Sequence, residues 1–391
     1  MYTNCARNKY YNIVKINYIV LAEIINMKNI VILSYLFLFI TAYAQSQGCI
    51  AIRNISALGQ FAQLGYKQTS DKWSLDISNR YFKANRFLEG TKNITPSDLN
   101  SGVTLYEYTM NFELSRVLDN GWAISLDMPI SANKTSGPVE HVSGESHTTH
   151  AFGLGDMRFT VYKWLLNTNT VHKGNIQFGL GIKFPTGNYH TEDYFYSSAS
   201  DKTFKELAPV NVAIQLGDGG TGITTQLNTF YIFNQHISLF GNFFYLINPT
   251  DVNGVASWPP GVLPPDAVIL FHATTYDVNS VPDNYTLRGG ANFTFNKFVV
   301  VAGLRYEGAP AHDLIGENDG LRRVGHIFSV EPGINYKLKK SYLYAYVTLP
   351  VDRRTIETVE DKRQAAITGI YTITPGHFAN VVYFFGYAFT F

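Results

Sequence analysis

The end of the chain alternates aromatic and small side chains. Stepping back two residues at a time from Phe391 gives Phe389, Tyr387, Phe385 and Tyr383, while the intervening positions are mostly small. Alternate side chains of a strand point to opposite faces, so this pattern predicts a strand with one aromatic face. In water such a terminal strand would be an aggregation-prone edge. A closed membrane barrel removes the problem, because lipid solvates the aromatic face and the first strand pairs with the edge. A terminal strand of a soluble sandwich is the alternative.

The composition also favours a membrane barrel. Charged residues make up 16% of the 391 residues and aromatic residues 15%, whereas charged residues form about a quarter of a typical soluble domain. Beyond the N-terminal region, no segment has the roughly 18 consecutive apolar residues that a membrane-spanning helix needs. The net charge of +1 provides no basic surface, so no nucleic-acid partner is expected.

A secretory signal peptide is predicted to begin at Met27. A lysine follows this methionine, residues 30–40 are mainly apolar, and an A-x-A cleavage site ends at Ala44. We therefore expect Met27 to be the biological start; an unusually long leader is the alternative. Residues 1–44 are the predicted extension and signal peptide, and residues 45–391 a single barrel with a short periplasmic lead-in. One cysteine remains after cleavage, which excludes an internal disulfide framework.

Strand-like alternation recurs along the remaining chain. The clearest example is a hairpin in which residues 106–114 and 122–130 alternate apolar and polar side chains around the turn Asp119-Asn120-Gly121. Counted with the first and last strands, twelve segments follow this pattern: 73–78, 106–114, 122–130, 157–162, 176–184, 223–231, 237–247, 285–295, 298–306, 328–338, 343–349 and 379–391.

The connections between these segments alternate between long and short. Outer-membrane barrels have long external loops and short periplasmic turns, and an even strand number places both ends of the barrel on the periplasmic side. The sequence therefore predicts an all-β fold, a closed antiparallel transmembrane β-barrel of about twelve strands, in a bacterial outer membrane. The predicted external loops are 89–102, 132–154, 185–220, 248–283, 308–324 and 351–378.

The polar face of the predicted strands must line the lumen, because charge on the lipid face costs about 2–4 kcal/mol at the midplane. These charges either line a selective pore or brace the wall through salt bridges. Twelve strands enclose more space than the roughly eight that side chains alone can fill, so we expect a pore or a plug. Loop 248–283, with Phe271 and Tyr276, could fold inward as a constriction or remain an exposed tip. The candidate lumen and solute residues are Glu107, Asp127, Arg158, Lys183, Arg288, Arg305, Glu307 and Glu331.

Catalytic and metal-binding patterns are weak. His141, His147 and His150 share one loop, but their spacing fits no strong ligand template, so a solvated loop is favoured over a metal site. His326 and Ser329 are three residues apart and fall on opposite strand faces, so they cannot form a nucleophile–base pair. We predict no enzyme activity, no metal and no cofactor.

Three glycine-rich motifs resemble a known family. Residues 153–158 read GLGDMR, residues 179–187 read GLGIKFPTG and residues 215–222 read QLGDGGTG. In this order and spacing they resemble the outer-membrane proteins grouped under meta-pathway phenol degradation, and residues 303–308, GLRYEG, fit the same resemblance. The resemblance implies a barrel transporter for an aromatic or apolar solute. It defines no binding residues.

The predicted function is that of an outer-membrane channel or transporter, which passes small, aromatic or hydrophobic solutes by passive diffusion. The alternative is a closed structural or interaction barrel that acts through its external loops. The expected partners are outer-membrane lipid, a small-molecule solute and the barrel-assembly machinery, because the terminal Phe391 with hydrophobic residues at every second position resembles an outer-membrane sorting signal.

Overall fold

The computed structural model describes residues 73–94, 102–138, 141, 145–167, 170–171, 173–198, 200–259, 261, 270 and 273–391. The predicted signal peptide and lead-in lie outside these described residues, and so does Phe271.

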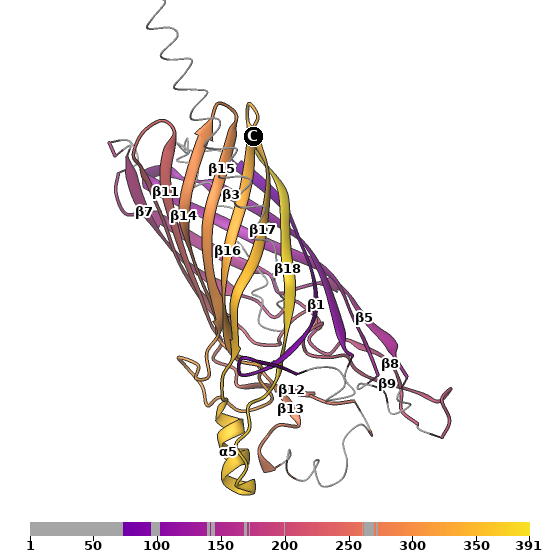
Figure 1. The fold of residues 1–391 in the computed structure, drawn as a ribbon. Coiled ribbons are helices and arrows are strands. Elements are labelled where there is room, and N and C mark those ends of the chain that lie inside the picture. Colours follow the sequence, from indigo (N-terminus) through magenta and orange to yellow (C-terminus); the bar gives the residue numbers. More distant parts are fainter. Residues whose placement is uncertain are drawn as a thin grey trace, which may run out of the picture. The chain divides into compact units, whose positions relative to one another are not determined.

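Within the described residues, twelve strands form one closed antiparallel barrel (Figure 1). Each strand pairs with its neighbours in chain order. The first strand also pairs with the last, where Tyr81 lies opposite Tyr383, so the predicted closure is confirmed. The barrel strands are β1 (Trp73–Glu89), β3 (Thr104–Val117), β4 (Trp122–Gly137), β6 (Arg158–Trp164), β7 (Gly174–Lys183), β10 (Gly222–Ile232), β11 (Ile237–Ile247), β14 (Asn284–Phe295), β15 (Phe298–Ala309), β16 (Gly325–Lys337), β17 (Ser341–Thr355) and β18 (Gly376–Thr390).

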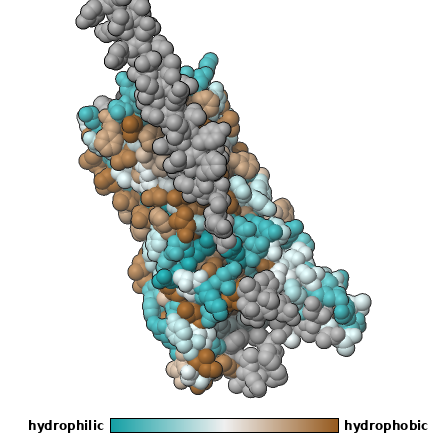
Figure 2. Space-filling view, in the orientation of Figure 1, coloured by the Kyte–Doolittle hydropathy of each residue, from teal (hydrophilic) through white to brown (hydrophobic). Residues whose placement is uncertain are grey.

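The two faces of the wall have opposite chemistry. In β4, Leu126 and Met128 are exposed on the outside, whereas the intervening Asp127 is fully buried. In β18, Tyr383 and Phe385 are exposed and Phe384 is buried. Figure 2 shows hydrophobic residues over the barrel wall and more hydrophilic residues toward the end that carries the loops. An apolar exterior around a polar interior is the pattern of a barrel that spans lipid.

Short turns close one end of the barrel. The β3–β4 turn is the single 3₁₀ turn η1 (Asp119–Gly121), in which Asn120 has a φ of 56°. Asn296 has a φ of 55° in the β14–β15 turn, and asparagine tolerates this left-handed region well. Trp73 lies at this same end, because it pairs with Arg116 beside the β3–β4 turn. Phe391 lies next to it, since the amide of Phe391 donates to the carbonyl of Trp73 at 2.9 Å.

The opposite end carries long connections with secondary structure of their own. Within the described residues these are β2 (Lys92–Ile94), β5 (His147–Leu154), β8 (Glu192–Tyr196), β9 (Lys205–Pro209), β12 (Val252–Ala256), β13 (Val278–Ser280) and α5 (Val359–Thr368). Thr358 and Asp361 form a capping box at the start of α5, and Gly369 ends it in the left-handed conformation. Among the described residues, no helix is long and apolar enough to cross a membrane.

The predicted external loops were too long. Most of the predicted loop 132–154 is strand, because β4 continues to Gly137 and β5 pairs with this extension. Asn133 and Thr135 point inward and are buried, while Lys134 is exposed. Inward-facing and outward-facing positions are both polar in this part of β4. The alternation of apolar and polar residues on which the prediction relied therefore ends before the strand ends.

Candidate functional site

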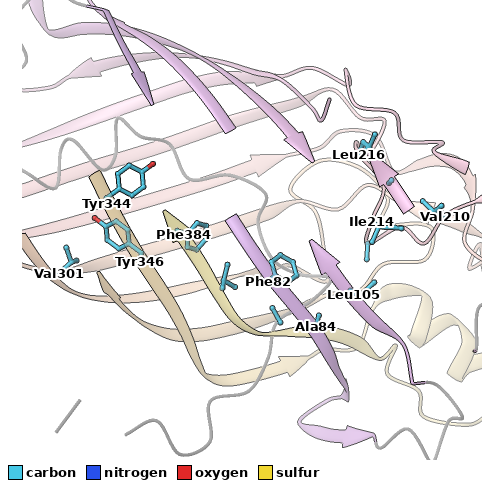
Figure 3. Close-up of a cluster of buried hydrophobic side chains, with 14 of the residues drawn as sticks. Phe82, Ala84, Leu105, Val210, Ile214, Leu216, Val301, Tyr344, Tyr346 and Phe384 are labelled. Atoms are coloured by element: carbon cyan, nitrogen blue, oxygen red, sulfur yellow. The ribbon is translucent and has the colours of Figure 1, made fainter. Parts of the chain in front are cut away.

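The connection between β7 and β10 folds into the barrel. Its residues Val210, Ile214 and Leu216 are buried and belong to one cluster with Phe82 of β1 and Leu105 of β3 (Figure 3). We call residues 210–216 the inward segment. The side-chain amide of Asn133 on β4 donates to the carbonyl of Ile214 at 3.3 Å. The inward segment therefore rests against the inner wall.

Loop 248–283, which was predicted to fold inward as a constriction, contributes less to the lumen than the inward segment does. Its Tyr276 is buried, and its hydroxyl donates to the carboxylate of Asp361 on α5 at 2.7 Å. This aromatic side chain therefore braces the external helix. Asn253 and Ser280 from the same connection do reach the cavity described below.

The three glycine-rich motifs meet at the base of the inward segment. The carboxylate of Asp156, between β5 and β6, accepts hydrogen bonds from the amides of Gly187 at 3.0 Å and Asp218 at 3.1 Å. Lys183 at the end of β7 pairs with the carboxylate of Asp218, and its Nζ lies 3.8 Å from Asp156. Lys183 was one of the predicted site residues, whereas Asp156 and Asp218 were not, although each of the two aspartates stands in a glycine-rich motif.

Thr186, Gly187 and Gly217 also contribute to the contact between the three glycine-rich motifs. The Thr186 hydroxyl donates to the carbonyl of Gly155 at 2.9 Å and accepts from the amide of Met157 at 2.8 Å. A Cβ atom on Gly217 would lie 2.6 Å from the carbonyl oxygen of Gly187, so the two backbones approach as only glycine allows. We call the following set the loop latch: Asp156, Lys183, Thr186, Gly187, Gly217 and Asp218.

A cavity of about 200 Å³ lies inside the barrel, next to the loop latch and the inward segment. Strands and external connections both contribute to its wall. Its charged lining residues are Asp156, Arg158, Lys183, Asp218, Arg322 and Arg323, and its large apolar ones are Val212, Leu216, Phe244, Leu246 and Leu321.

The eight proposed lumen residues are all buried on the inner face of the wall. Arg158 and Lys183 line the cavity. Arg158 pairs with Asp127, with 3.1 Å between Nη2 and Oδ2, and its guanidinium lies 5.1 Å from the centre of the Phe244 ring. Glu107 pairs with Arg80 at 3.3 Å. Arg80 was not among the predicted lumen residues, because it lies beyond residues 73–78, the segment predicted for the first strand.

The other four form a separate ion cluster. Glu331 accepts from Nε of Arg288 at 2.8 Å and from Nη1 of Arg305 at 3.3 Å. Nη2 of Arg305 also donates to Glu307 at 2.7 Å. Thr348 completes the partners of Glu331 at 3.1 Å. None of these four charged residues belongs to the cavity lining, so here the salt-bridge interpretation fits better than direct contact with solute.

The histidines of the β4–β5 connection serve packing. The His147 ring stacks on Tyr196 of β8 with ring centres 3.5 Å apart, and Nδ1 of His141 accepts from the amide of Tyr196 at 3.2 Å. Burial, followed by the nearby His147, lowers the pKa of His141 to about 4. In the part of the chain that the structure describes, no group of three or more potential ligands could hold a metal ion.

No protein-family model and no curated protein matches this sequence. Solved structures do match. An outer-membrane channel from Pseudomonas putida F1 superposes with a TM-score of 0.54 at 9% identity, over 83% of this chain and 97% of that one. The chain folds as a bacterial outer-membrane barrel. At this identity the likeness shows the fold alone.

Two further channel structures match with lower scores. The CymD monoaromatic hydrocarbon channel has a TM-score of 0.42 at 9% identity, over 88% of this chain and 94% of that one. The toluene transporter TbuX of Ralstonia pickettii has a TM-score of 0.39 at 10% identity, over 89% of this chain and 97% of that one. The narrower resemblance to the meta-pathway family stays a prediction.

Proposed function

We propose that this barrel is a channel through which small solutes cross the outer membrane by passive diffusion. The observation that carries the proposal is the cavity inside the lumen, bounded by a loop segment that side-chain and backbone hydrogen bonds hold in place. A segment attached in this way can be displaced at lower cost than a wall strand, because it is not part of the backbone hydrogen-bond ladder that closes the barrel.

The solutes we propose are single-ring aromatic or similarly small apolar compounds. Phe244, Leu246 and Leu216 supply an apolar surface in the cavity, and the glycine-rich motifs resemble the meta-pathway family. The cavity volume of about 200 Å³ is comparable to the apolar cavity of about 150 Å³ that holds benzene in another protein. Ligand pockets of this kind combine an apolar lining with a few placed polar groups.

One observation favours the closed structural barrel as a second candidate. The ion cluster around Glu331 and the buried Tyr344 and Tyr346 fill part of the interior with side chains that hold one another. If this cluster closes the lumen completely, the external connections would be the functional surface instead.

Swelling of proteoliposomes separates the two candidates. The refolded chain is placed in liposomes, which are then transferred to isotonic solutions of a small polar solute or of a sulfonated benzene that lipid excludes. The channel predicts swelling well above that of protein-free liposomes and faster for smaller solutes. Liposomes that swell no faster than the protein-free control would favour the closed barrel.

Two partner assignments belong to the same proposal. Exposed apolar residues along the outer wall, such as Leu180 and Leu304, fit a lipid environment. We further infer that β18 is the strand that the barrel-assembly machinery recognises, because its exposed face ends in Phe391. Assembly of a Phe391→Ser variant in cells tests this inference, and normal assembly would contradict it.

A further inference from the structure

The neighbouring strands β1, β3, β4 and β5 carry two matched rows of side chains on the outer face of the barrel. Paired residues lie side by side across a sheet, so the strand register defines both rows. We call the first the aromatic row, which consists of Tyr81, Tyr108, Ala132 and Phe152. The second lies one pair nearer the end that carries the loops, and we call it the cationic row, which consists of Lys83, Tyr106, Lys134 and His150.

The outward-facing residues change from apolar to polar across these two rows. On the side of the short turns, the aromatic row is followed by Met110, Ile130 and Leu154. On the side of the loops, the cationic row is followed by Thr104, Ser136 and Thr148. Aromatic side chains mark the boundary between lipid and water in membrane barrels. The cationic row therefore lies at the level of the lipid headgroups on the external side.

Two lysines of the cationic row approach the same ring. Nζ of Lys83 lies 5.4 Å from the centre of the Tyr106 ring, and Nζ of Lys134 lies 4.8 Å from it. Over the ranges that the structure describes, neither ammonium takes part in an ion pair. Two like charges beside lipid repel each other more strongly than in bulk water, because the local dielectric constant is lower. An anion bound by both lysines would therefore stabilise the pair.

Two other basic residues of the outer face have partners within the protein. Lys163 lies 4.8 Å from the centre of the Trp122 ring, at the end of the short turns, and its ammonium also donates to the carbonyl of Asn120 at 2.6 Å. Nδ1 of His150 lies 3.4 Å from the carboxylate of Asp193 on β8. Both side chains are thus engaged, in contrast to the two lysines beside Tyr106.

A groove of about 420 Å³ lies along the two rows on the outer wall. Ala132 has the smallest side chain of the aromatic row and lies between Tyr108 and Phe152, so the wall is hollowed at this point. Lys134 borders the same groove. Glu107 also borders it, but its carboxylate forms an ion pair with an arginine on the inner face. The groove therefore combines aromatic walls with positive charge on the side of the loops.

We propose that Lys83 and Lys134 bind the phosphate of a lipid headgroup in the outer leaflet, and that the groove beside them holds the apolar part of the same lipid. Lysine binds phosphate as a compact point charge, and each basic residue near a membrane surface strengthens the binding of an anionic lipid by about fivefold. This inference goes beyond the channel function. It depends on the outer wall and the membrane location, and it holds whether or not the barrel conducts.

Lipid binding by the refolded full chain tests the proposal. Native mass spectrometry of the barrel in a nonionic detergent measures how much of it carries lipid A, a phosphorylated glycolipid, or the same glycolipid without its phosphates. We expect the phosphorylated form to bind at least about tenfold more tightly. Millimolar inorganic phosphate should not displace it, because free phosphate gains nothing from the groove. Equal affinity for the two glycolipids, or displacement by inorganic phosphate, would overturn the proposal.

Variants assign the binding to the two lysines. The double variant Lys83→Gln/Lys134→Gln should weaken binding of the phosphorylated glycolipid by about thirtyfold. The matched control, Lys163→Gln/Lys297→Gln, removes the same charge at the end of the short turns and should bind as the wild type does. Unchanged affinity in the first double variant, or an equal loss in the control, would overturn the proposal.

A conservative replacement separates charge from packing. Lys83→Arg/Lys134→Arg keeps both positive charges and should bind the phosphorylated glycolipid about as tightly as the wild type, whereas a loss equal to that of the glutamine variant would overturn the proposal. A second copy of this chain is the alternative occupant of the face, and light scattering of the detergent complex detects it. A glutamine variant that changes the oligomeric state but not lipid binding would assign the face to contact between copies, and would also overturn the proposal.

Discussion

The carboxylate of Asp156 accepts the backbone amide of Asp218 at 3.1 Å, although 62 residues separate the two in the chain. The same carboxylate accepts the amide of Gly187 at 3.0 Å. One side chain between β5 and the wall strand β6 therefore holds both ends of the connection that enters the lumen. The loop latch thus sets how firmly the inward segment is seated.

Replacement of this carboxylate should loosen the inward segment. Asp156→Asn removes the charge beside Lys183 and turns one acceptor into a donor that faces another donor. The loss of a charged hydrogen bond predicts roughly ten- to hundredfold faster hydrogen exchange of residues 210–218. Asp119→Asn, in turn η1 at the opposite end, is the matched control. Equal exchange in both variants would show that Asp156 does not hold the segment.

Steric substitution provides an independent test of the loop latch. A Cβ atom at Gly217 would lie 2.6 Å from both the Gly187 carbonyl oxygen and Asp156 Oδ1, whereas one at Gly289 in β14 would approach nothing closer than 3.6 Å. We expect Gly217→Ala to displace the inward segment and change single-channel conductance, while Gly289→Ala keeps the wild-type value. Indistinguishable conductance in the two variants would refute the close approach.

The ion cluster around Glu331 should be important for stability. Glu331→Gln leaves Arg288 and Arg305 buried with less compensation, and breaking a buried pair in this way costs about 3–5 kcal/mol. The urea midpoint of unfolding should fall accordingly. Glu317→Gln, on an exposed external connection, should leave the midpoint in place. A midpoint that Glu331→Gln does not change would argue that water already reaches this part of the lumen.

Acid should weaken the packing between the β4–β5 and β8–β9 hairpins. Burial lowers the pKa of His141 to about 4 from an ordinary value of 6.5, so the unfolded segment binds a proton more readily than the folded one. The stabilisation is therefore fully present above pH 6.5 and is lost as the pH falls toward 4. Hydrogen exchange at Tyr196 should accelerate over this interval.

His141→Gln keeps a polar side chain that does not titrate, and should remove most of this pH dependence. The neighbouring His147 and Asp193 remain in that variant and serve as its internal control. A pH profile that His141→Gln leaves unaltered would assign the transition to another group.

The barrel could be predicted from the sequence because side chains that face lipid must be apolar, whereas those that face the lumen can be polar. Leu126 and Met128 must be apolar and Asp127 must point inward, so alternation reveals the strand. Where a strand extends outside the membrane, its outward-facing side chains no longer need to be apolar. The extension of β4 to Gly137 has polar residues on both faces, and nothing in the alternation distinguishes it from a loop.

The candidate site was only partly predictable for a related reason. The glycine-rich motifs marked the right segments, and Lys183 was identified from its place on the polar face. The pairing of Asp156 with Asp218 depends on how a connection returns into the lumen, which has no periodic signal.

Single-channel recording of the refolded wild-type chain in a planar bilayer tests the central claim most directly. We expect discrete conductance steps, which a small single-ring aromatic solute reduces in a concentration-dependent manner and which increase in amplitude when Asp156→Asn loosens the inward segment. A folded, heat-modifiable barrel that inserts into the bilayer and shows no conductance, alone or as the Asp156→Asn variant, would contradict the channel.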